Sequence, residues 1–242
     1  MEHLVIPDTQ VRPGLKKSQL KHLDALACYI NTHVPDKVIM LGDWWDMPSL
    51  CRYDVVGSKK TEGRRIQKDI DAGNRAMDNF VESLEYQPEM HFLMGNHEDR
   101  LLKLGKEDPR FEGVFDNAFN LDAWYVHDFL TPVELDGIYY CHYFVAQYTG
   151  RALGGNALSQ LKQLGFSFTA GHKQILDISR IDRNNKTSVQ GLVAGAFYQH
   201  DEEYKGEQGN NHARCIVHKK MVKNGTYDLE VVSIERLLKE YL

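Results

Sequence analysis

The chain has 242 residues, the length of one large domain or of one domain with an insertion. Its composition, with 42% hydrophobic, 10% aromatic and 26% charged residues, is ordinary for a globular protein. The net charge of −5 is not that of a typical nucleic-acid-binding protein, which is usually basic, although a local basic patch can still bind nucleic acid.

Cysteine usage and hydropathy indicate the cellular compartment in which the protein is expected. Four cysteines are scattered along the chain without a C-x-x-C pair, which favours free thiols in a reducing compartment over a disulfide framework. No charged-then-apolar leader opens the sequence, and no apolar run approaches ~20 residues. We therefore expect a cytoplasmic protein without a membrane partner.

Short apolar runs predict strands, and apolar residues at helical spacing predict helices. In chain order the first half reads as strand 3–7, helix 16–32, strand 37–41, polar stretch 52–72 leading into a helix that ends near residue 85, strand 90–94, and then a short helix and a loop. The second half reads as strand 137–143, helix 156–164, strand 166–172, hairpins 175–182/187–194 and 212–223/226–234, and helix 234–242.

This order of elements predicts the fold. Early β-α-β units followed by hairpins favour two mixed sheets packed face to face with helices outside, a four-layer α/β/β/α sandwich. We expect a single domain over residues 1–242, with a helical and polar insertion at about 52–85 and hairpins of the second sheet at 175–234. The polar loop 199–211 is the best candidate for a mobile segment.

Five polar clusters follow predicted strands. They are Asp8-Thr9-Gln10, Gly42-Asp43-Trp44-Trp45-Asp46, Gly95-Asn96-His97-Glu98, His142, and Gly171-His172-Lys173-Gln174. Strand ends in a layered α/β fold point toward a common crevice, so the clusters are expected to converge. Carboxylates, an amide oxygen and imidazoles are suitable ligands for divalent ions, and we predict a metal site at the carboxyl ends of the strands.

In this order the clusters resemble the calcineurin-like metallophosphoesterases, which carry D-x-H, G-D-x-x-D, G-N-H-[ED], a lone H and G-H-x-H. The resemblance runs from residue 4 to about residue 174. The opening Pro7-Asp8-Thr9-Gln10 also resembles small phage proteins of this kind, similar to the DNA-repair nucleases of the superfamily. If a phage encodes the protein, we expect it in the host cytoplasm. The resemblance implies a hydrolase of phosphoester bonds.

The resemblance also implies two divalent ions that share one aspartate. One ion would take Asp43, Asn96, His142 and His172, and all four residues are present. The other would take Asp8, Asp43 and two further residues that are histidines in the family but Gln10 and Gln174 here.

We interpret this matched replacement as a retuned site. An oxygen-rich ligand set suits Mn²⁺ or Mg²⁺ better than Zn²⁺, so we expect a tight histidine-bearing site beside a weak second one, with Mn²⁺ favoured and Mg²⁺, Fe or Zn²⁺ open. The alternatives are a one-metal enzyme or an inactive one. A nearby histidine, His200 or His212, is a further candidate for the missing nitrogen.

The resemblance assigns roles around the metals. A metal-bridging hydroxide would attack phosphorus, and His97 would be the leaving-group acid. Glu98 is a candidate to orient His97, and Asp46 to hold a ligand histidine. Arg100 is a candidate phosphate contact, although a solvated arginine is the alternative.

Further residues are candidates for substrate binding, each with a plainer alternative. Trp44 or Trp45 could stack on a nucleobase or pack beneath the next loop. Lys173 could add charge at the mouth of the pocket or point to water, and His200 is a third candidate. The basic run 59–68 could contact a nucleic-acid backbone or form a solvated face.

Three functions remain open from the sequence. We favour a phosphodiesterase acting on nucleic acid, DNA or RNA. A phosphomonoesterase or small-nucleotide phosphodiesterase is the alternative within the enzyme class. A non-catalytic binding module that keeps the fold is supported only by Gln10 and Gln174.

Overall fold

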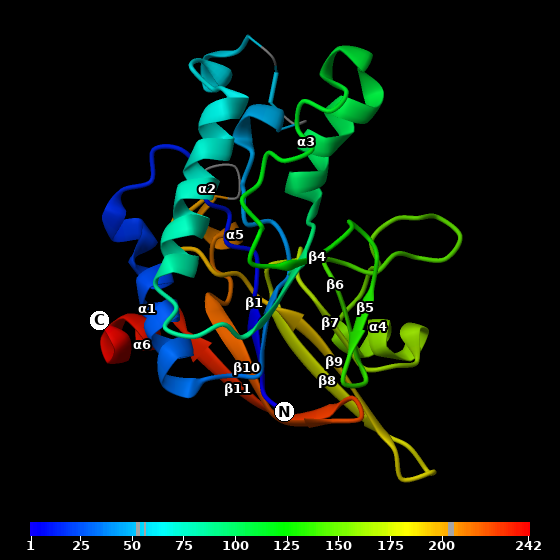
Figure 1. Cartoon of the computed structure of the whole chain (residues 1–242). Coiled ribbons are helices and arrows are strands. Elements are labelled where there is room, and N and C mark those ends of the chain that lie inside the picture. The colour runs from blue at the N-terminus through cyan, green and yellow to red at the C-terminus, as the bar shows by residue number, and fades with distance from the viewer. Residues whose placement is uncertain (52–53, 56, 203–205) are drawn as a thin grey trace.

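Two mixed β-sheets pack face to face in the structure, a computed structural model that describes residues 1–51, 54–55, 57–202 and 206–242 (Figure 1). The first sheet has the strand order β11-β10-β1-β2-β3-β4, in which β1 to β4 are parallel and β10 and β11 are antiparallel to their neighbours. Its strands are β1 (His3–Ile6), β2 (Lys37–Met40), β3 (Glu89–Leu93), β4 (Tyr125–His127), β10 (Cys215–Lys223) and β11 (Thr226–Ser233).

The second sheet has the order β5-β6-β7-β9-β8, with a parallel centre of β6, β7 and β9 and an antiparallel strand at each edge. Its strands are β5 (Val133–Leu135), β6 (Ile138–Cys141), β7 (Phe168–Ala170), β8 (Leu176–Asp182) and β9 (Ser188–Ala194). The parallel strands of both sheets place their carboxyl ends, and the polar residues that follow them, at one end of the molecule.

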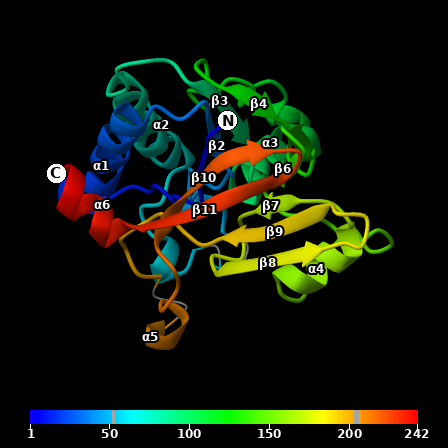
Figure 2. The ribbon, with the colours of Figure 1, turned by 90° about the horizontal axis from the view of Figure 1, so that it is seen from below.

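Helices cover both outer faces, so the predicted α/β/β/α layering is confirmed (Figures 1 and 2). The described helices are α1 (Lys17–His33), α2 (Ile66–Glu82), α3 (Asn96–Glu107), α4 (Ala157–Leu164), α5 (Gly206–Gly209) and α6 (Ile234–Tyr241), with 3₁₀ turns η1 (Pro48–Leu50), η2 (Lys59–Thr61) and η3 (Pro109–Phe111). Residues of α1, α2, α3 and α6 pack with the outer face of the first sheet, and α4 packs on the second.

Side-chain alternation along the strands explains this layering. In β1, Leu4 and Ile6 pack under the helices, whereas Val5 packs between the sheets. Strands buried on both faces read as continuous apolar runs, which is the pattern that marked them in the sequence. Tyr140 and Leu192, which belong to the second sheet and lie opposite Val5, complete the core between the sheets.

Most predicted elements are present, with some differences. The Asn224-Gly225 turn is confirmed, because both residues have positive φ, 48° and 81°, and connect β10 to β11. Strands β4 and β5 were not predicted, because three residues each are too few to show a period. Helix α3 runs over 12 residues and is longer than the short helix expected there.

Two predicted polar segments lie partly outside the described residues. These are the stretch 52–72, which includes 52–53 and 56, and the loop 199–211, which includes 203–205. In the part of the chain that the structure describes, no helix is both long enough and apolar enough to cross a membrane.

Candidate metal centre

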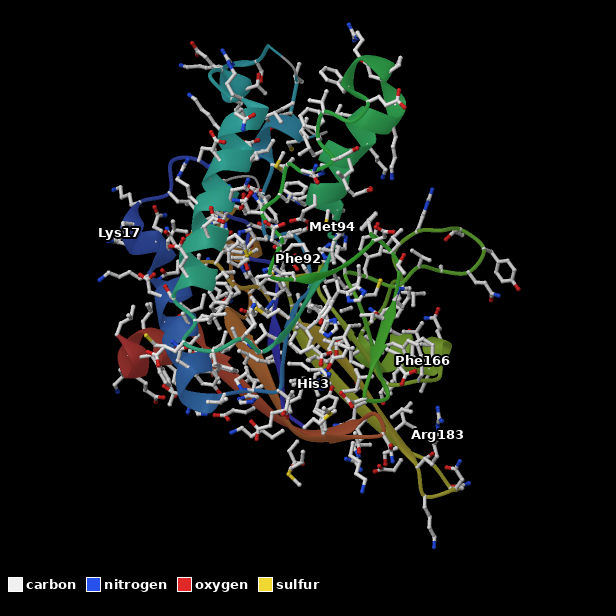
Figure 3. The ribbon with its side chains drawn as sticks, viewed as in Figure 1. His3, Lys17, Phe92, Met94, Phe166 and Arg183 are labelled. Atoms are coloured by element: carbon white, nitrogen blue, oxygen red, sulfur yellow. The ribbon has the colours of Figure 1, made fainter. Side chains whose placement is uncertain are left out.

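The five polar clusters converge at the carboxyl ends of the parallel strands. In Figure 3, Met94 lies just after β3 at this end, and His3 lies at the opposite end of the first sheet. Backbone hydrogen bonds join the loops after β1 and β2, since the nitrogens of Thr9 and Gln10 donate to the carbonyl oxygen of Asp43 at 3.1 and 2.9 Å. The backbone nitrogen of His172 donates to Asp8 Oδ1 at 3.0 Å, so the topology also brings together residues 164 positions apart.

Three side chains are close enough to bind one metal ion. Ligand atoms of Asp43, His142 and His172 all lie within 4.8 Å of one another. The Oδ1 atom of Asn96 lies 3.0 Å from Nε2 of His142, so Asn96 is a candidate for a fourth ligand. These donors, one carboxylate, one amide oxygen and two imidazoles, fit a divalent cation.

A hydrogen bond to the backbone orients the ring of His142. Its Nδ1 donates to the carbonyl oxygen of Leu41 at 2.7 Å, which directs Nε2 toward Asp43 Oδ2 at 3.4 Å. A hydrogen bond on the far nitrogen is the usual way to orient a metal-binding imidazole. Burial lowers the pKa of His142, but Asp43 outweighs it and raises the pKa to about 9. The same imidazole, with His97, holds the pKa of Asp43 well below its ordinary value although burial opposes this.

Glycines allow the carboxylates to lie against the backbone. A Cβ on Gly95 would lie 2.2 Å from Asp43 Oδ1, and a Cβ on Gly171 would lie 2.6 Å from Asp8 Oδ1. Asp43 and His172 themselves have positive φ, 54° and 65°. Left-handed backbone at non-glycine residues is strained and often accompanies functional sites.

Glu98 has a different role from the predicted one. Its carboxylate is fully buried and accepts hydrogen bonds from the backbone nitrogens of Asp43 (2.9 Å), Gly95 (2.9 Å) and Trp45 (3.1 Å). Burial, with the nearby charge of Asp43, raises its pKa to about 7. Glu98 therefore fixes the loops that carry the ligands, and the prediction that it orients His97 is wrong.

Asp46 orients His97 instead. The Nδ1 atom of His97 contacts the carbonyl oxygen of Asp46 and lies 3.5 Å from its Oδ1, so Asp46 is the partner of His97 and not, as expected, of a ligand histidine. The Nε2 atom of His97 lies 3.6 Å from Asp43 Oδ2. Burial lowers the pKa of His97, but Asp43 and Asp46 outweigh it and raise the pKa to about 9. Arg100 is half-buried, and its charge lowers the pKa of His97.

The second predicted metal position has weaker donors. Asp8 is fully buried, and its Oδ1 accepts from the backbone nitrogen of His172 at 3.0 Å. The Nε2 atom of Gln174 lies 3.4 Å from Asp8 Oδ2, whereas its Oε1 accepts from the hydroxyl of Tyr198 at 2.9 Å. Burial and the charge of Asp43 raise the pKa of Asp8 to about 6. Gln10 is 4% exposed and lies two residues after Asp8 in the chain.

The predicted stacking by Trp44 is wrong. Trp44 and Trp45 are both fully buried in the core under the helices. Trp44 donates from Nε1 to the carbonyl oxygen of Gly73 at 3.1 Å, and the ring of Trp45 lies 4.4 Å from that of Phe119. Neither indole is available to a ligand, because both anchor the loop after β2.

Lys173 and His200 also have structural partners. The ammonium of Lys173 donates to the carbonyl oxygen of Gly155 at 2.6 Å. His200 is 6% exposed, stacks on Tyr198 at 4.6 Å, and lies 3.1 Å from Glu202. The ring of His212 lies 5.2 Å from Tyr198. Both histidines proposed as extra ligands therefore surround Tyr198.

Three residues near the site were missed in the sequence. Tyr198 contacts Gln174, and the guanidinium of Arg12 lies 3.4 Å from Asp46 and 3.0 Å from Glu202. Nothing in the local pattern marks them, because their partners lie far away in the sequence. The one possible sequence signal is that Arg12 lies four residues after Asp8, in the same loop at the end of a strand.

One cavity lies away from this centre. It has a volume of about 660 Å³ and is lined by residues of 48–66, including Lys59, Arg64 and Arg65. Arg64 is paired with Asp54 at 2.6 Å. Part of the predicted basic run therefore lines a cavity.

Comparison with protein-family models and with curated proteins gives no match. Among solved structures, the chain is similar to YfcE, described as a phosphoesterase from E. coli, with 8% sequence identity and a TM-score of 0.44 over 96% of this chain and 100% of that chain. This likeness is too distant to assign a family, so we infer the chemistry of the site from the residues of this chain.

Proposed function

We propose that this protein is a metal-dependent phosphoesterase that hydrolyses phosphodiester bonds, with nucleic acid as the favoured substrate. One observation supports this function above all. Four candidate ligands for a divalent ion, Asp43, Asn96, His142 and His172, lie together, and the imidazole of His97 lies beside them, with its Nε2 3.6 Å from Asp43 Oδ2. A scaffold without catalysis has no need for an acid next to a metal.

The chemistry divides between the ion and the protein. A divalent ion bound by the four ligands supplies positive charge to the phosphoryl oxygens and lowers the pKa of a nucleophilic water. His97, held through Nδ1 by Asp46, presents the Nε2 proton to the leaving oxygen. Arg100 adds a second cationic donor on the same helix, suited to a phosphate oxygen.

We infer a second, weaker ion at Asp8, Gln10, Asp43 and Gln174. Oxygen donors favour Mn²⁺ or Mg²⁺ there. The amide nitrogen of Gln174 now faces Asp8, so binding requires the amide to turn and bring Oε1 toward the ion. This rearrangement makes the site weaker than the histidine-bearing one.

The alternative is a phosphomonoesterase or a phosphodiesterase of small nucleotides. Two observations favour it: the net charge of −5, and the burial of Trp44 and Trp45, which removes one expected platform for a nucleobase. Activity on DNA that falls steeply with salt would favour the nuclease, since contacts to the phosphate backbone release counterions.

Hydrolysis of bis-p-nitrophenyl phosphate by metal-stripped protein, titrated with Mn²⁺, tests the proposal. We expect activity that rises in two steps with Mn²⁺ and is abolished in Asp43→Asn. In His97→Ala, activity should fall by ~10²–10⁴-fold while Mn²⁺ binding is retained, because His97 is not a ligand. A folded wild-type protein that stays inactive at saturating Mn²⁺ would refute the diesterase.

A further inference from the structure

Residues 143–155, between β6 and α4, form a projecting arm (Figures 1 and 3). The arm is a small hairpin in which the nitrogen of Ala146 donates to the oxygen of Arg151, and that of Leu153 to the oxygen of Phe144, both at 2.8 Å. Phe144 and Leu153 are buried at its base. The arm is therefore an ordered element with a hydrophobic anchor.

Both ends of the arm are attached to the metal-binding loops. Its first residue, Tyr143, directly follows the ligand His142, and its ring lies 4.6 Å from the ring of His172. Its last residue, Gly155, accepts the hydrogen bond from Lys173, which follows His172. These contacts fix the direction of the arm relative to the metal centre.

The tip of the arm presents an aromatic ring to solvent. Tyr148 is 94% exposed, the largest exposed fraction among the described large hydrophobic side chains, and Arg151 is also exposed. Within the described part of the chain, neither side chain has a hydrogen bond, ion pair or ring contact. The arm contains no acidic residue, although the chain has 34. It is a surface suited to an aromatic and anionic partner.

We propose that this arm binds a single strand of nucleic acid whose scissile phosphate lies at the metal centre. Tyr148 stacks on a base, and Arg151 contacts a backbone phosphate. The inference rests on the proposed function and names its substrate class.

A strand of nucleic acid can extend from the metal centre to the tip of the arm. Tyr148 lies six residues after His142, so at about 3.3 Å per residue the tip is at most about 20 Å from the metal ligand. Stacked nucleotides advance about 3.4 Å each, so a strand of about six nucleotides covers even this greatest distance. Stacking on one exposed ring is tolerant of base identity, so we expect little sequence preference.

The test measures binding and turnover separately. Fluorescence anisotropy with a fluorescein-labelled single-stranded oligo-dT, with Ca²⁺ in place of Mn²⁺, gives Kd. Steady-state kinetics on the same strand and on bis-p-nitrophenyl phosphate give kcat and KM. In Tyr148→Ala we expect Kd and KM for the strand to rise about tenfold, with bis-p-nitrophenyl phosphate hydrolysis unchanged.

Matched variants separate stacking from structural effects. Tyr148→Phe should bind as the wild type does, because it keeps the ring. Arg151→Ala should weaken binding and reduce its salt dependence. Tyr125→Ala, at a 65% exposed tyrosine on β4 at the edge of the first sheet, is the control and should change nothing.

The outcomes distinguish this inference from the proposed function. No binding of oligo-dT by the wild type, or equal binding by Tyr148→Ala, would overturn the role of the arm even if bis-p-nitrophenyl phosphate is hydrolysed. If the protein binds the strand through Tyr148 but hydrolyses no substrate, the binding role of the arm would stand and the proposed phosphoesterase activity would be refuted.

Discussion

Gly95 and Asp43 show how closely the backbone surrounds the ligands. The hypothetical Cβ of Gly95 would meet Asp43 Oδ1 at 2.2 Å, the Asp43 nitrogen at 2.4 Å and Glu98 Oε2 at 2.8 Å. Two of these atoms belong to buried carboxylates that have no room to move. The G-N-H motif therefore needs glycine to admit Asp43, and not only to make a turn.

We predict that Gly95→Ala loses metal affinity and stability together. The clash must displace Asp43 or the start of α3, and overpacking of this kind destabilises proteins by ~1–3 kcal/mol. Thermal unfolding and Mn²⁺ titration check this. Gly154→Ala is the control, because a Cβ there meets no atom within 4 Å. A Gly95→Ala protein that binds Mn²⁺ normally would contradict the packing argument.

Gln10 and Gln174 permit a gain-of-function prediction. The double variant Gln10→His and Gln174→His should bind a second Mn²⁺ tightly, because imidazole replaces a weak amide ligand beside Asp8 and Asp43. Plasma mass spectrometry after gel filtration gives the metal content, and electron paramagnetic resonance detects coupling between two Mn²⁺ ions. His172→Ala, which removes a ligand of the other ion, is the comparison. Unchanged metal content in the double variant would mean that positions 10 and 174 do not face a metal position.

At the scale of elements, an ion pair joins the loop after β1 to the segment after β9. Arg12, in the loop after β1, bridges Asp46 and Glu202, and Glu202 also contacts His200 in the segment after β9. Burial raises the pKa of Glu202, but His200 and Arg12 outweigh it and lower the pKa to about 2. The ionised carboxylate thus holds the segment near Tyr198 against the loop of Asp8.

We predict that Glu202→Gln destabilises the protein at neutral pH by ~1–3 kcal/mol, since it leaves Arg12 with a weaker partner. A folded-state pKa below the unfolded value of about 4.5 gives stability that is present above pH 4.5 and is lost as the pH falls toward 2. The difference from wild type should therefore shrink between pH 7 and pH 3 in urea unfolding. Glu112→Gln, at an exposed site, is the control. A difference that does not vary with pH would exclude the charge as its cause.

At the scale of the whole molecule, a lysine lies between the two sheets. Lys219 of β10 is fully buried, and its Nζ contacts the hydroxyls of Thr169 and Tyr140, the latter at 3.2 Å. The rings of Tyr140 and Tyr227 lie 4.5 and 4.4 Å away and favour the charged form. Burial nevertheless lowers the pKa of Lys219 well below its ordinary value.

We predict that Lys219→Met stabilises the protein at pH 7, by ~1–3 kcal/mol, because a buried polar group is replaced by an apolar one of similar length. The unfolded lysine binds a proton that the folded one does not, so wild-type stability rises with pH up to the unfolded pKa of about 10.4. The advantage of the variant should therefore decline toward pH 10 in urea unfolding. Lys17→Met, at an exposed position of α1, is the control. A variant that is less stable at pH 7 would mean that the hydrogen bonds of Lys219 outweigh its desolvation.

Asp43, His142 and His172 lie close together, as expected from the sequence, because each follows an apolar strand and parallel strands bring their carboxyl ends together. The role of Trp44 was predicted wrongly because composition near a site does not tell which face of a loop a side chain occupies. The role of Glu98 was wrong because its partners are backbone nitrogens, which no sequence pattern names.

The sequence by itself predicted the layered α/β fold, because the order of strands and helices follows from local patterns, and its resemblance to a known family named the candidate ligands. Only the tertiary structure decided the partner of His97, the contacts of Arg12, Tyr198 and Glu202, and the exposure of Tyr148. These depend on the packing of segments distant in the chain. Hydrophobic burial fixes which faces meet, and the polar contacts then form between whichever groups that packing leaves opposite each other.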